Sequence, residues 1–88
     1  MIRRRVIVHG RVQGVGFRYS VLRIARQHGL GGWVSNRWDG AVEAVCEGEA
    51  DAVERVVRFM RDGPRGAEVE RVDVVEEAPE GVSGFDVR

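Results

Sequence analysis

The spacing of apolar residues switches repeatedly between a period of two and a period of about 3.6, and this alternation limits the folds open to the chain. Residues 3–9 alternate as in a strand, and residues 17–28 repeat apolar positions at helical spacing. The Asp39-Gly40 pair predicts a hairpin turn between two further strands. The remaining predicted elements are strands at 32–37 and 41–47, a helix at 50–61, a strand at 69–77 and a short terminal strand at 85–88.

The resulting order, βαββαβ, predicts an α+β fold built as a ferredoxin-like two-layer sandwich. It has an antiparallel sheet and both helices on one face. Right-handed crossovers place the first and third strands side by side at its centre. The alternation is poor near Glu70 and Arg71, which predicts a bulge or an irregular start in strand 69–77. We expect residues 1–88 to form a single domain.

Composition narrows the class of protein. Fourteen arginines balance fourteen acidic residues, so the formal charge is zero, whereas nucleic-acid binding usually needs a basic surplus. The single cysteine, Cys46, excludes an internal disulfide, and the longest apolar runs are too short for a membrane span. We expect a cytoplasmic monomer that binds neither nucleic acid nor membrane. Near its start the sequence has a run of three arginines, Arg3, Arg4 and Arg5, which we expect to be the solvated start of the first strand.

A glycine-rich loop joins the first strand to the first helix. Gly10, Gly14 and Gly16 allow a curled backbone whose N–H groups point inward at an anion. The helix that follows adds the positive end of its dipole, and Arg18 adds a guanidinium that can grip two phosphate oxygens. A tight strand-to-helix connection explains the same glycines equally well. The loop lacks the lysine of a Walker motif, and the chain has no room for a dinucleotide-binding sheet.

Two stretches carry a family resemblance: GRVQGVGFR at 10–18 and GWVSNRWDGAVE at 32–43. Both resemble the signature blocks of the acylphosphatases, ferredoxin-like enzymes that hydrolyse the carboxyl–phosphate anhydride of acyl phosphates. The resemblance implies that Arg18 binds the substrate phosphate and that Asn36 positions the attacking water. It also implies that Gln13, Gly14, Val15, Gly16 and Phe17 form the phosphate-binding turn. Without the resemblance, Asn36 reads as a residue that ends a strand before a turn.

No cofactor or metal ion is expected. The two histidines and Cys46 lack the spacing of metal ligands, and Asp39, the one candidate for a magnesium ion, reads as an ordinary hairpin aspartate. Ser35, Arg37 and Trp38 lie beside Asn36 in the sequence and are candidates for shaping the leaving-group pocket.

Two other functions are compatible with the sequence. GVGFRY in a ferredoxin-like fold is compatible with a single-stranded RNA binder, in which Phe17 and Tyr19 stack on bases. Against this, the motif enters a helix rather than lying on a central strand. The second alternative is a domain that handles carbamoyl phosphate within a larger maturation protein. No zinc-type cysteine pair or further domain supports it.

Overall fold

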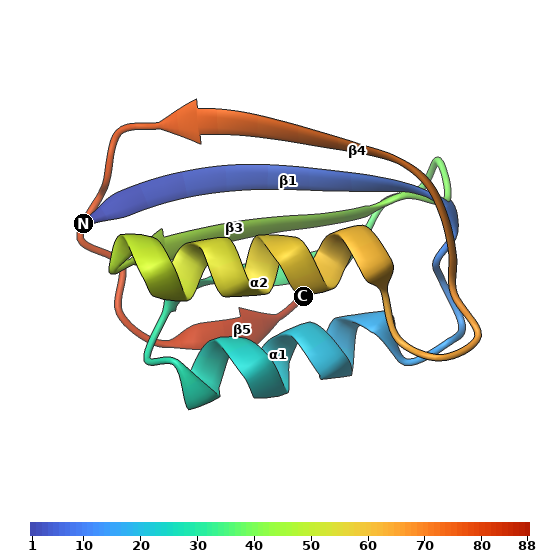
Figure 1. Cartoon of the computed structure of the whole chain (residues 1–88), viewed down its shortest axis with the longest axis horizontal. Coiled ribbons are helices and arrows are strands. Elements are labelled where there is room, and N and C mark those ends of the chain that lie inside the picture. The colour runs from blue at the N-terminus through green and yellow to red at the C-terminus, as the bar shows by residue number, and fades with distance from the viewer.

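In the computed structural model of the chain, which describes residues 1–88, two helices cover one face of a five-stranded sheet (Figure 1). All the predicted elements are present, with ends shifted by only one or two residues. In chain order they are β1 (Ile2–Arg11), α1 (Phe17–Gln27), β2 (Gly31–Asn36), β3 (Val42–Gly48), α2 (Ala50–Asp62), β4 (Glu68–Glu77) and β5 (Phe85–Val87).

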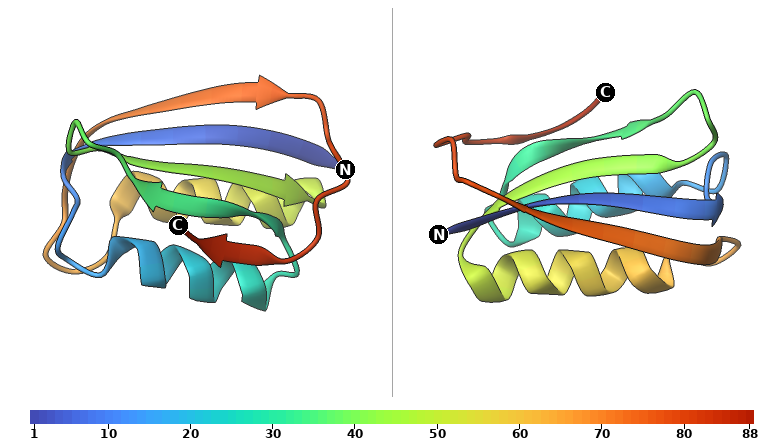
Figure 2. Two further views of the ribbon diagram at one scale, coloured as in Figure 1. Left: turned by 180° about the vertical axis from the view of Figure 1, so that it is seen from behind. Right: turned by 90° about the horizontal axis from the view of Figure 1, so that it is seen from above.

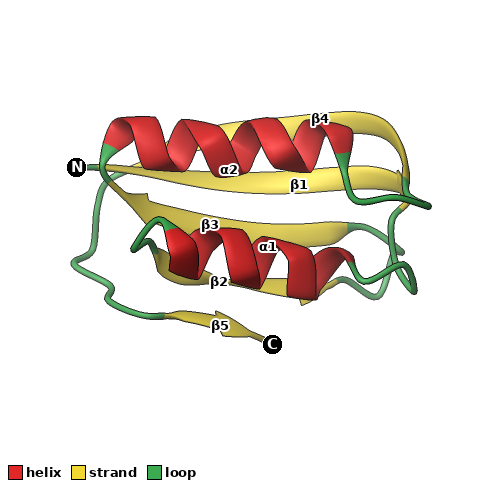
Figure 3. Ribbon diagram, turned by 60° about the horizontal axis from the view of Figure 1, so that its bottom comes forward, coloured by secondary structure: helices red, strands yellow, loops and turns green.

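The strands lie in the order β4-β1-β3-β2-β5, so β1 and β3 are central neighbours, as predicted. The four longer strands are antiparallel to their neighbours, but β5 runs parallel to β2 (Figure 3). The sheet is therefore mixed, and the prediction of a wholly antiparallel sheet is wrong at this edge. The reason is the connection at 78–84, which passes around one end of the sheet from β4 to β2. Strand β5 thus starts where β2 starts and runs in the same direction.

The main core lies between the sheet and the two helices, which share one side of it in the views from behind and from above (Figure 2). It contains Val6, Val8, Val42, Ala44 and Cys46 from the sheet, and Phe17, Val21, Ala25, Val53, Val56 and Met60 from the helices. Burial raises the pKa of the Cys46 thiol to about 12, which keeps it protonated at neutral pH. Cys46 is therefore a packing residue of the core.

A bulge in β4 lies opposite the end of β1, next to the loop that follows. Opposite β1, His9 pairs with Arg71 and Gly10 pairs with Val69, so Glu70 has no partner and the predicted irregularity is confirmed. A Cβ atom on Gly10 would lie 2.2 Å from the main-chain oxygen of Glu68, and only glycine permits this close approach. His9 is hydrogen-bonded to Asp73 on β4 at 3.0 Å and does not line the pocket described below.

The arginines at the start of β1 are held in place rather than solvated, which corrects the sequence expectation. The guanidinium of Arg3 is almost fully buried and lies 2.8 Å from Glu77 and 3.3 Å from Glu47. The Glu47 carboxylate also accepts N–H bonds from residues 80–82, at 2.7–2.9 Å. Strand pairing brings these charges together, because β3 and β4 are the neighbours of β1 in the sheet. The paired side chains lie on the sheet face that carries no helix.

No helix in the structure has both the length and the apolar character needed to cross a bilayer.

Candidate active site

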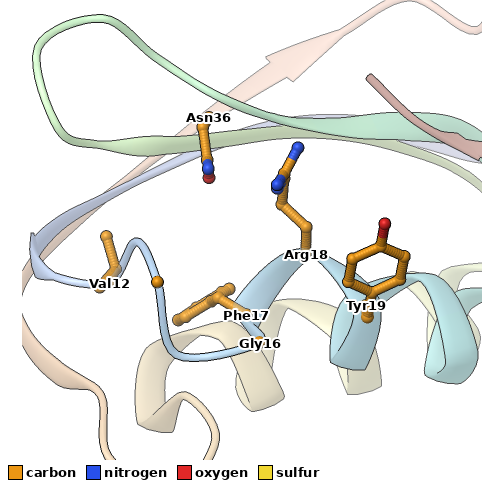
Figure 4. Close-up of a pocket in the computed structure, with 7 residues that line it drawn as sticks. Val12, Gly16, Phe17, Arg18, Tyr19 and Asn36 are labelled. Atoms are coloured by element: carbon orange, nitrogen blue, oxygen red, sulfur yellow. The ribbon is translucent and has the colours of Figure 1, made fainter.

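A pocket of about 110 Å³ opens at the end of the sheet where β1 leaves it, between the glycine loop, the start of α1 and the end of β2 (Figure 4). Its lining is Val12, Gly14, Gly16, Phe17, Arg18, Tyr19 and Asn36. The structure thus brings together residues from the two sequence blocks. Of the predicted site residues, Gln13 and Val15 belong to the loop but do not line the pocket.

The loop presents a row of unpaired main-chain donors. None of the N–H groups of residues 13–19 donates a hydrogen bond within the protein. Gly16 is the N-cap of α1 and has φ 77°, a left-handed conformation that suits glycine. No acidic side chain lies in the first turn of α1, so the positive end of the helix dipole is not neutralised from within. Free N–H groups at a helix N-terminus are a favourable environment for an anion.

Arg18 contributes a fixed positive charge to the pocket from the first turn of α1. Its Nη1 donates a hydrogen bond of 3.1 Å to the main-chain oxygen of Arg88. The N–H of Arg88 in turn donates to the carbonyl of Val34 on β2, at 2.8 Å. The rest of the Arg18 fork has no partner in the protein and stays available to a ligand in the pocket.

Asn36 is the last residue of β2 and approaches the pocket from the sheet side (Figure 4). Its main chain pairs with Val42, while its carboxamide makes no hydrogen bond within the protein. Gln13 fixes the hairpin that carries Asn36, because its Nε2 donates to the carbonyls of Arg37 at 2.7 Å and Ala41 at 3.0 Å. The Gln13 side chain therefore ties the loop to the hairpin, a role that the sequence did not suggest.

The predicted turn at Asp39 forms within the hairpin. Asp39 accepts hydrogen bonds from Arg37 at 3.2 Å and from the N–H of Ala41 at 3.1 Å. The bond from Arg37, followed by that from Ala41, lowers the pKa of the Asp39 carboxyl. No group of three or more histidine, cysteine or carboxylate side chains in the structure is arranged to hold a metal ion.

Tyr19 was missed as a pocket residue by sequence reasoning, which considered it only as a base-stacking side chain. Ser35, Arg37 and Trp38, the sequence candidates for the leaving-group side, do not line the pocket. The Trp38 side chain is almost completely exposed at the hairpin tip. The available signal for Tyr19 was its place directly after Arg18, in the first turn of a helix that starts at the loop.

The βαββαβ order and the helix-covered sheet place the chain in the ferredoxin-like class of α+β proteins. The acylphosphatase family model matches residues 4–87. An acylphosphatase of Trichormus variabilis is 56% identical over 88 residues, covering 100% of this chain and 87% of that protein. The chain belongs to the acylphosphatase family, and its enzymatic class is that of an acylphosphatase hydrolase.

Solved structures show the same relationship. The crystal structure of acylphosphatase from Bacillus subtilis has a TM-score of 0.95 and 42% identity, covering 100% of this chain and 99% of that chain. Full-length HypF, solved in a phosphate- and nucleotide-bound form, matches with a TM-score of 0.91 and 28% identity. That match covers 99% of this chain but only 12% of HypF, so the shared fold is a small part of the larger protein.

Proposed function

We propose that this chain hydrolyses the carboxyl–phosphate bond of small-molecule acyl phosphates without a metal ion or other cofactor. Residues 1–88 act in this proposal as one catalytic domain, monomeric and cytoplasmic. The observation that carries the proposal is the pocket itself. The cavity is bordered by Gly14, Gly16, Phe17, Arg18 and Tyr19, whose N–H groups are free, and by Asn36, whose carboxamide is unengaged.

The phosphoryl group is held by the loop and Arg18 in this account. Gln13, Gly14, Val15, Gly16 and Phe17 contribute main-chain N–H groups, and Arg18 contributes its fork. The donors of the residues that line the pocket have no other partner before substrate arrives, so little reorganisation is needed as charge develops in the transition state.

The chemical step is an in-line displacement at phosphorus. Water oxygen forms a bond to phosphorus while the bond to the acyl oxygen breaks, giving a carboxylate, inorganic phosphate and a proton released to solvent. A carboxylate is a weakly basic leaving group, so general-acid assistance is not required. Asn36 can both donate and accept hydrogen bonds, which lets it hold the water in one orientation. Its contribution is positioning, since a carboxamide is not a base at neutral pH.

Hydrolysis of benzoyl phosphate in water enriched in oxygen-18 tests this proposal. We expect micromolar protein to release benzoate and phosphate in equal amounts, with the label in phosphate. Label in benzoate would show attack at the carbonyl carbon and contradict the assigned roles. No release above the uncatalysed rate would contradict the proposed function as a whole.

A further inference from the structure

We infer that Tyr19 forms the wall of the pocket that receives the acyl group, and that it favours flat aromatic acyl groups over small aliphatic ones. This inference rests on the proposed function and deepens it by naming a substrate preference. Its starting point is the position of Tyr19 among the pocket residues, next to the arginine proposed to bind phosphate.

The direction of the reaction decides on which side the acyl group lies. In an in-line displacement, the attacking and leaving oxygens occupy opposite sides of phosphorus. Asn36 marks the attacking side, so the acyl group extends away from it. In Figure 4 the Arg18 side chain lies between Asn36 and the ring of Tyr19. Tyr19 lines the pocket next to Arg18, and we assign the acyl group to this side.

Tyr19 is an exposed aromatic residue of the pocket. The residue is 64% exposed, although its side chain is large and mostly apolar. The other exposed large apolar residues are Met1, Trp38, Val75 and Val82, and none of them lines the pocket. The pocket thus offers polar donors to the phosphate and one free aromatic surface beside them.

A benzoyl group can lie against this ring, whereas an acetyl group is too small to cover it. An aromatic pair gains a preferential interaction beyond simple area burial, worth about a three- to tenfold effect on binding. This interaction persists in the transition state, so it acts on kcat/KM. The ring, rather than the phenol hydroxyl, is responsible for the preference.

The test compares kcat/KM for benzoyl phosphate and acetyl phosphate in Tyr19→Ala, Tyr19→Phe and Trp38→Ala. We expect Tyr19→Ala to lower the benzoyl-to-acetyl ratio by about three- to tenfold. Tyr19→Phe keeps the ring and should keep the ratio. Trp38→Ala removes an even more exposed aromatic residue that lies outside the pocket, and it should also leave the ratio unchanged. The inhibition constant of inorganic phosphate should be the same in all variants, because the loop and Arg18 remain intact.

Several outcomes would overturn the inference. Equal losses for both substrates in Tyr19→Ala would show that the ring does not select the acyl group, while the proposed function would stand. A ratio that falls in Trp38→Ala but not in Tyr19→Ala would assign the selection to the hairpin tip. A parent protein that hydrolyses neither substrate would refute the proposed function, and this inference with it. Alanine is a good helix former and Tyr19 is exposed, so unchanged thermal melts are expected.

Discussion

Arg18 Nη1 donates a 3.1 Å hydrogen bond to the main-chain oxygen of Arg88, so a pocket side chain on α1 is oriented by the residue that follows β5. Arg88 is itself held at the sheet edge. Its N–H bonds to Val34, and its guanidinium lies over the Trp33 ring with 4.7 Å between the guanidinium carbon and the ring centroid. The short parallel strand β5 thus contributes to the pocket without lining it, by limiting where the Arg18 guanidinium can point.

Arg18→Lys should weaken phosphate binding even though the charge is kept. Lysine loses the planar fork that can bond two phosphate oxygens at once. A hydrogen bond to a charged group contributes about 1.5–3 kcal/mol, so the inhibition constant of inorganic phosphate should rise by roughly ten- to a hundredfold. Steady-state inhibition of benzoyl phosphate hydrolysis measures this change.

Arg23→Lys is the matched control for this substitution, since Arg23 lies on the same helix, is exposed and does not line the pocket. It should leave phosphate inhibition and turnover unchanged. If Arg18→Lys also leaves both unchanged, Arg18 does not belong to the phosphate site.

Activity should survive exhaustive chelation. In the proposed mechanism, Arg18 and the main-chain donors of the loop supply the positive charge that a metal ion supplies in other phosphoryl-transfer enzymes. The measurement is benzoyl phosphate turnover before and after dialysis against EDTA, and again after adding magnesium. Turnover that is lost with EDTA and restored by magnesium would require a metal in the mechanism and would direct attention to Asp39.

Stability should fall in acid partly through Glu47. Hydrogen bonds from the N–H groups of residues 80–82, that of Glu80 first, and from Arg3 lower the pKa of the Glu47 carboxyl below its usual 4.5. A lowered pKa in the folded state stabilises the protein above pH 4.5, and this contribution is lost as the pH falls through the lowered value. Glu47→Gln should therefore lower the melting temperature at pH 7 and make it less dependent on pH in acid.

Glu76→Gln provides the comparison for Glu47, because the Glu76 side chain is largely exposed and its ion pair with Arg4 contributes little. Its melting temperature should match that of the parent. Glu47 pairs near the start of β1, at the end of the sheet away from the pocket, so turnover of Glu47→Gln well below its melting temperature should be near normal. An unchanged melting curve for Glu47→Gln would show that the buried carboxylate does not hold the connection at 78–84.

The periodicity of the sequence predicted the elements and their order because each depends on neighbouring residues. The sequence could not reveal which charges meet across the sheet. Arg3 and Glu77 are far apart in the chain and become neighbours only through strand register, so Arg3 was assigned to solvent. Trp33 is half-buried beside the guanidiniums of Arg5 and Arg88, and the sequence could not show this because a period of two does not reveal which face of the sheet the helices cover.

The two sequence blocks predicted that Arg18 and Asn36 share a site, and both residues line the same pocket. The positions of Gln13 and Tyr19 depend on how the loop curls, which glycine-rich sequences leave undetermined. The bonds from Gln13 to the hairpin and the exposed ring of Tyr19 beside Arg18 are therefore visible only in three dimensions.

The most direct test of the account is Asn36→Ala, because it separates water positioning from phosphate binding. An interaction made only in the transition state lowers kcat and leaves ground-state binding nearly unchanged. Removing a preorganised polar group of this kind lowers kcat on the order of a hundred- to a thousandfold. The control is Ser35→Ala, the preceding residue of β2, which does not line the pocket and should behave as the parent.

The measurement is steady-state hydrolysis of benzoyl phosphate by Asn36→Ala, with phosphate inhibition and thermal melting on the same preparation. We expect a kcat lower by about a hundred- to a thousandfold, a near-normal phosphate inhibition constant and an unchanged melting temperature. A normal kcat would contradict the role of Asn36 in positioning water. A melting temperature far below that of the parent would make Asn36 a structural residue at the end of β2.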